Sequence, residues 1–114
     1  MNRSTIVPLY DKPFYSYNIN LAGTSYHLKF VYNEQTESYF MSIYTYDKIP
    51  ISLGINLVPR LPIAYWLSDQ NWTGFFYLSP IADIEKDYNR IKPRKIHEYY
   101  ELIYYYDDQQ EQNL

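Results

Sequence analysis

The sequence predicts an all-β, mostly antiparallel domain, built as a small curled sheet or a β-barrel of about six strands. Two observations support this class. Side chains alternate with a period of two along FYSYNINL (14–21) and SYHLKFVY (25–32), which is typical of half-buried strands. In addition, 16 of the 114 residues are tyrosine, which favours strands and suits half-buried surfaces because an apolar ring carries a polar tip.

The first half of the chain predicts a three-stranded antiparallel meander. The strand over 14–21 is followed by a turn at 22–24, where Gly23 can adopt a positive φ, and then by the strand over 25–32. A polar connection over 33–38 leads to a third strand, YFMSIYTY, over 39–46.

The second half is interrupted by prolines. Three prolines between residues 47 and 62 predict that the strand there is short and lies at an edge or is bulged near Gly54. The run LPIAYWL (61–67) predicts a short helix, because Pro62 suits a first helical turn. A turn over 71–74 precedes a buried strand over 75–78, and residues 81–95 form a polar connection with at most one helical turn.

The last apolar stretch, IHEYYELIYYYDDQQ (96–110), fits either a helix or a strand by periodicity alone. We assign a strand, because tyrosine is weak in helices and the rest of the chain supplies β partners. Tyr100, Leu102 and Tyr104 should then face the core, with the alternate side chains facing outward. The domain organisation is an N-terminal arm over 1–13, a single β domain over 14–106 and a polar C-terminal tail over 107–114.

Composition excludes several classes of protein. The chain has no cysteine, which excludes disulfide frameworks and thiolate metal sites. Ten basic against thirteen acidic residues give a net charge of −3, which disfavours a protein whose main partner is nucleic acid. No segment has the pattern of a signal peptide or the length of a membrane span, so neither is expected.

No arrangement typical of catalysis or of a cofactor is present. The two histidines, His27 and His97, both fall in predicted strands without a supporting signature, and no GxSxG motif or glycine-rich phosphate loop occurs. Asp83, Glu85 and Asp87 have the first spacings of a calcium loop. The positions that need glycine and glutamate hold Tyr88 and Arg94, so a charged loop is expected instead. We therefore expect no enzyme, cofactor or metal.

One alternative function remains open, a small β-barrel module that binds single-stranded nucleic acid or glycan. Arg90, Lys92, Arg94 and Lys95 form a basic cluster beside a tyrosine-rich strand, as in single-strand binding grooves, although nearby acidic residues weaken its field. Exposed Trp66 or Trp72 would be needed for glycan binding.

The outward tyrosines favour an assembly protein instead. If both sides of the last strand carry apolar residues, only one side can face the core, and the other needs a partner. The candidate protein-interface positions lie on the last strand and at the end of the third: Tyr44, Tyr46, Tyr99, Ile103, Tyr105 and Tyr106.

The order of these features resembles the baseplate plug family of tailed bacteriophages, named from a cyanophage component. The resemblance runs through FYSYNINLAGTSYHLKFVYNEQTESYFMSIY, with its Gly-containing turn, the pair Tyr32-Asn33 and an Ile-Tyr ending, then PISLGINLVP and YYELIYYYDD. It spans about residues 7–107.

This resemblance implies a non-enzymatic structural protein of the virion, seated at the hub of a tail baseplate, where it helps assemble or seal the axial channel until DNA delivery. The implied partners are hub, spike, tube or wedge proteins and further copies of this chain, with no membrane and no nucleic acid except passing DNA. The implied location is the tail baseplate, and the host cytoplasm during assembly.

Overall fold

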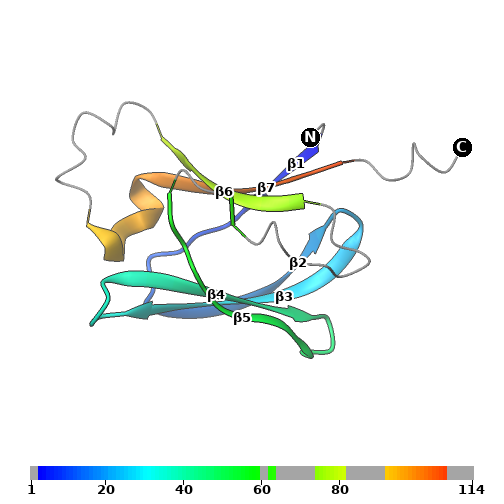
Figure 1. The fold of residues 1–114 in the computed structure, drawn as a ribbon, viewed down its shortest axis with the longest axis horizontal. Helices are drawn as coiled ribbons and strands as arrows, with labels where there is room; N and C mark the ends of the chain where they lie inside the picture. Colours follow the sequence, from blue (N-terminus) through cyan, green and yellow to red (C-terminus); the bar gives the residue numbers. More distant parts are fainter. Residues whose placement is uncertain (1–2, 60–61, 64–73, 82–91, 108–114) are drawn as a thin grey trace, which may run out of the picture.

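A computed structural model describes residues 3–59, 62–63, 74–81 and 92–107. The described strands form two antiparallel sheets, and Figure 1 shows them as two layers. A four-stranded sheet has the order β2-β3-β4-β5, and a three-stranded sheet has the order β1-β7-β6. The first contains β2 (Phe14–Leu21), β3 (Thr24–Asn33), β4 (Ser38–Thr45) and β5 (Pro50–Asn56), and the second contains β1 (Arg3–Val7), β6 (Gly74–Pro80) and β7 (Tyr100–Tyr106).

The β2–β3 hairpin closes through a two-residue turn. Leu21 pairs with Thr24, and the two residues between them, Ala22 and Gly23, have φ values of 54° and 86°. Two positive φ values define a type I′ turn, whose twist matches that of the flanking strands. The Asn20 side-chain oxygen accepts a hydrogen bond of 3.0 Å from the Gly23 amide. The predicted hairpin is confirmed, with the turn one residue shorter than expected.

The β4–β5 pair is irregular, as the prolines and glycine predicted. Met41 pairs with Ile55 and Ile43 pairs with Ser52, so β5 has one more residue than β4 between these pairs. Gly54 lies in this bulge with φ of 66°, and its amide donates a 3.0 Å hydrogen bond to the Ser42 hydroxyl. β5 is also the edge strand of its sheet, which confirms the sequence prediction.

β1 lies in the segment that the sequence suggested was an arm, so the described residues contain seven strands rather than about six. It pairs with β7 from Arg3 opposite Tyr106 to Val7 opposite Leu102. The central strand β7 therefore bridges β1 and β6. Gly74, at the start of β6, approaches β7 so closely that an added Cβ would lie 1.9 Å from the Tyr105 carbonyl oxygen.

The core lies between the two sheets and draws buried side chains from both. Leu28, Phe30, Met41 and Ile43 come from the four-stranded sheet. From the three-stranded sheet come Val7, Phe76, Leu78, Tyr100, Leu102 and Tyr104. The predicted inward residues of the last strand, Tyr100, Leu102 and Tyr104, are all buried, which confirms that prediction.

The all-β antiparallel class is confirmed, in the form of two packed sheets rather than a barrel in the described residues. A 3-10 segment, η2 (Pro93–Glu98), begins in the predicted polar connection and continues into the predicted last strand. The strand prediction is therefore wrong for residues 96–98, and β7 begins only at Tyr100. The predicted helix at 61–67 lies mostly outside the described residues, although Ile63 forms an isolated bridge with Phe76. Residues 108–114 of the predicted tail also lie outside them.

Candidate functional site

The most prominent candidate site is the surface of the three-stranded sheet that faces away from the core. Two cross-strand rows form it. Ile103 on β7 pairs with Ile6 on β1 and Tyr77 on β6, and Tyr105 pairs with Ser4 and Phe75 in the same way. We call the surface formed by Ile6, Phe75, Tyr77, Ile103 and Tyr105 the aromatic outer face.

This face follows from the alternation of side chains along β7. Tyr104 faces the core with 1 % exposure, so its neighbours Ile103 and Tyr105 point the other way and are only half-buried. The Phe75 and Tyr105 rings lie 5.7 Å apart across the strands, and Ile6 is 60 % exposed. Neither of these two cross-strand rows contains a charged residue, which makes this part of the sheet surface largely apolar.

The six sequence-predicted interface residues do not form one surface. Ile103 and Tyr105 belong to the aromatic outer face. Tyr99 and Tyr106 pack partly against the core, and the Tyr106 ring stacks on Tyr104 at 5.6 Å.

The two candidates from the third strand lie on the other sheet. Tyr44 pairs with His27 on the outward side of β4, with the two rings 5.9 Å apart. Tyr46 follows β4 and is 62 % exposed. These two residues belong to a different part of the molecule from Ile103 and Tyr105.

Sequence reasoning missed three residues of the aromatic outer face. Phe75 and Tyr77 alternate with the buried Phe76 and Leu78, so the signal was present in a run that looked uniformly apolar. Ile6 was missed together with its strand.

The basic cluster joins the two sheets at one end. The Lys95 ammonium lies 3.0 Å from both carboxylate oxygens of Asp11, and the Arg94 guanidinium lies 3.1 Å from one of them. The hydrogen bond from Lys95 is the main reason that the pKa of Asp11 is lowered. Arg94 also donates to the Tyr39 hydroxyl at 2.9 Å, and that hydroxyl lies 2.9 Å from the Lys12 carbonyl oxygen. Two cations of the proposed nucleic-acid cluster are therefore engaged internally, and Arg90 lies outside the described residues.

A second group of tyrosines lies where the connection between β1 and β2 crosses the sheet. The Tyr15 ring stacks on Phe30 at 4.8 Å, and its hydroxyl accepts a hydrogen bond from the Tyr10 amide. The Tyr17 hydroxyl donates to the Pro8 carbonyl oxygen. Burial raises the pKa of Tyr15 to about 12, and it raises the pKa of Tyr17 as well. These hydroxyls stay protonated and structural at neutral pH.

The two histidines lie in different environments within the described residues. The His27 Nδ1 atom lies 2.7 Å from the Asn18 side-chain oxygen on the outward surface of the four-stranded sheet. Desolvation, followed by the charges of Lys48 and Lys29, lowers the pKa of His27. His97 lies in η2, and its Nδ1 atom is buried without a hydrogen-bond partner.

The described residues contain no cluster of three or more His, Asp or Glu side chains able to hold a metal ion. The calcium-like residues Asp83, Glu85 and Asp87, and the two tryptophans, lie outside the described residues. None of the helical segments in the described ranges has the length and apolar character of a membrane-spanning helix.

The described residues form a small all-β protein of two packed antiparallel sheets, and one of these sheets carries the aromatic outer face. A family model described as "Cyanophage baseplate Pam3 plug gp18" matches residues 4–108. The chain belongs to this family of phage baseplate plug proteins. Its place is accordingly the virion tail baseplate, its role is structural, and it associates with other baseplate proteins. No curated protein matches the chain.

Proposed function

We propose that this chain is a plug or hub-associated component that helps assemble or seal the axial channel of the baseplate until DNA is delivered. The family match over residues 4–108 carries the proposal, because it covers both sheets and therefore the whole described fold. The aromatic outer face supplies a physical means of binding a neighbouring protein. Its burial against a neighbour removes apolar surface from water without leaving a charge unpaired.

The neighbours at this face are hub, spike, tube or wedge proteins, or further copies of this chain. Ile103 and Tyr105 form the centre of the contact, since they lie on the middle strand between Ile6 and the β6 aromatics. The exposed Tyr46 lies in the turn that follows β4 of the other sheet, so it provides a separate contact. A subunit with contacts on two sides can join two neighbours, as a plug inside a ring of proteins must.

We propose a non-enzymatic role that needs no cofactor, carried out in the virion after assembly in the host cytoplasm. The alternative, a module for single-stranded nucleic acid or glycan, is less well supported. Arg94 and Lys95 both form ion pairs with Asp11, which reduces the positive charge available to a phosphate backbone. Contact with DNA is then limited to DNA passing through the channel.

The test is incorporation into baseplates. Phage lacking the wild-type gene would be complemented with tagged variants, and the amount of tagged chain that sediments with purified tails would be measured. We expect most of the Ile103→Asp chain to be absent from purified tails, because a carboxylate in the middle of a buried apolar contact leaves an unpaired charge. Ser16→Asp, at an exposed position on the outward surface of β2, is the matched control and should incorporate normally.

Sealing and assembly are separated by a second measurement on the same particles. Premature DNA release from otherwise complete virions supports sealing, whereas absent or incomplete baseplates support an assembly role. Normal incorporation of the folded Ile103→Asp variant, with normal titre and no DNA leakage, contradicts the proposal.

A further inference from the structure

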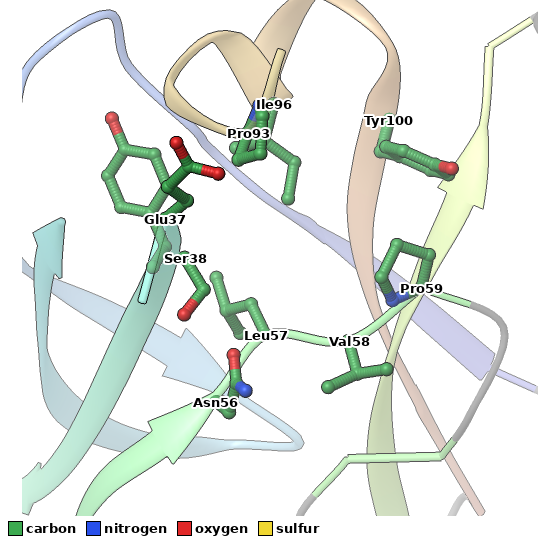
Figure 2. Close-up of a pocket in the computed structure, with 10 residues that line it drawn as sticks. Glu37, Ser38, Asn56, Leu57, Val58, Pro59, Pro93, Ile96 and Tyr100 are labelled. Carbon is green, nitrogen blue, oxygen red and sulfur yellow. The ribbon is translucent and has the colours of Figure 1, made fainter. Parts of the chain in front are cut away.

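A pocket lies at one end of the sandwich, away from the aromatic outer face. It has a volume of about 330 Å³, at the lower end of the range for small-ligand sites. Figure 2 shows it between the segment that follows β5, the start of β7 and η2. We call this cavity the end pocket. The described residues that line it are Glu37, Ser38, Tyr39, Asn56, Leu57, Val58, Pro59, Pro93, Ile96 and Tyr100.

The interior of the end pocket is apolar and rigidly supported. Leu57 and Tyr100, with exposures of 4 % and 3 %, belong to the buried core cluster, as does Ile96. The Leu57 amide donates a 2.9 Å hydrogen bond to the Tyr39 carbonyl oxygen, which fixes the segment after β5 against β4. Two prolines, Pro59 and Pro93, add walls that lose little conformational entropy when a ligand binds.

Among the described residues that line the end pocket, Glu37 is the only charged one. Its φ of 52° lies in the left-handed region, which glycine or asparagine adopts more easily than glutamate. No described residue forms a hydrogen bond or ion pair with its carboxylate. Glu37 is exposed, so its carboxylate lies beside an apolar pocket, on a residue with a disfavoured backbone conformation, and is bound by none of the described residues.

Asn56 completes the polar part of the lining. Figure 2 shows Asn56 beside Leu57, on the side of the pocket that also carries Ser38. A side-chain amide offers one donor group and one acceptor, which is what a peptide group of an extended chain requires. In its described residues, the end pocket therefore combines an apolar cavity, a side-chain amide and one negative charge.

We propose that the end pocket binds a short extended segment of a neighbouring baseplate protein, placing one aliphatic side chain in the cavity and an adjacent Lys or Arg against Glu37. Charge complementarity selects this occupant, because one negative charge beside an apolar cavity favours a cationic group next to an apolar one. The identity of the partner as a baseplate protein rests on the proposed function, whereas the binding preference of the pocket does not.

The binding preference is testable on the isolated full-length chain. Amide chemical shifts of the ¹⁵N-labelled protein would be followed during titration with three blocked dipeptides: acetyl-Leu-Lys-amide, acetyl-Leu-Glu-amide and acetyl-Ala-Lys-amide. We expect saturable shifts at Leu57, Val58 and Ile96 with the Leu-Lys probe, in the millimolar range. The Leu-Glu probe should bind about two- to fivefold more weakly, as expected for loss of an exposed ion pair. The Ala-Lys probe should bind about tenfold more weakly or worse, because most of the buried aliphatic area is gone.

Two variants assign the charge effect to one residue. Glu37→Gln should abolish the preference for the Leu-Lys over the Leu-Glu probe while leaving the spectrum otherwise folded. Glu34→Gln changes an acid of the same exposed turn that does not line the end pocket, and it should retain the preference. High salt should reduce the preference in the wild type, since exposed charge pairs are screened.

The proposal is overturned if the Leu-Lys probe gives no saturable shift at the end pocket, if the Lys and Glu probes bind equally, or if both glutamine variants behave alike. These outcomes are independent of the outer face. Loss of tail incorporation in Ile103→Asp with no probe binding would refute the end pocket alone. Probe binding together with normal incorporation of Ile103→Asp would refute the proposed role of the outer face alone.

Discussion

Two neighbouring tyrosines on β7 should respond in opposite ways to the same substitution. Tyr104 is 1 % exposed, and its ring lies 4.9 Å from that of Phe76 inside the core. Tyr105 is half-buried on the aromatic outer face. Tyr104→Asp and Tyr105→Asp therefore introduce one carboxylate on each side of the same strand.

The expected difference is large. Removing a buried aromatic side chain costs about 3–5 kcal/mol, and the unpaired buried carboxylate adds to this. A domain of this kind is stable by only about 5–15 kcal/mol, so Tyr104→Asp should be unfolded or close to it. Tyr105→Asp loses a cross-strand pair with Phe75, which is worth about 0.2–1 kcal/mol, and its carboxylate can reach water.

The assay is urea denaturation followed by circular dichroism, with tail incorporation measured in parallel. Tyr105→Asp should retain a cooperative transition close to that of the wild type and lose incorporation, whereas Tyr104→Asp should show no folded baseline. If Tyr104→Asp unfolds at the wild-type urea concentration, or if Tyr105→Asp is itself unfolded, the assignment of the two sides of β7 is wrong.

Three further predictions concern the scaffold. Gly74→Ala should lower the urea midpoint clearly, because its Cβ would lie 1.9 Å from the Tyr105 carbonyl oxygen and β6 would have to move off β7. A urea midpoint equal to that of the wild type would mean that β6 and β7 lie farther apart at Gly74 than the structure shows. Ala22→Asn should raise the thermal midpoint, since asparagine before Gly23 favours the positive φ values of a type I′ turn by about 0.5–1 kcal/mol; a lowered midpoint argues against that turn. Burial raises the pKa of Tyr15 to about 12, above the unfolded value near 10, so the folded state keeps a proton that the unfolded state releases. The urea midpoint should therefore be independent of Tyr15 below about pH 9 and should fall between pH 10 and 12, with a smaller fall in Tyr15→Phe.

The meander and the orientation of the last strand could be predicted from the sequence because both depend on local patterns. The alternation over 14–21 sets which side chains of β2 face the core, and the turn at Ala22-Gly23 sets where β3 begins. Along β7, alternation alone placed Tyr100, Leu102 and Tyr104 together once a strand was assumed. In a strand, alternate side chains point to opposite sides of the sheet, so the only open question is which of the two sets is buried. The more apolar set is the one that faces the core.

β1 was not predictable from its own residues. RSTIV is five residues long and ends at Pro8, and it contains only one clearly inward apolar residue, Val7. Its strand conformation depends on pairing with β7, almost the whole chain away, as in the register of Arg3 opposite Tyr106. Such a contact leaves no periodic signal in a single sequence, because tertiary pairing overrides weak local preference.

The same nonlocal pairing explains why the candidate site was only partly found. Ile103 and Tyr105 could be identified from β7 alone, but the surface they belong to needs Ile6 from one end of the chain and Phe75 from another segment. The four-stranded sheet, by contrast, forms from consecutive strands joined by short connections. The aromatic outer face therefore exists only after both ends of the described chain have paired. If a baseplate neighbour binds this face, as we propose, it binds only a completed fold, and an assembling tail would then discriminate a finished subunit from a partly folded one without any chemical signal.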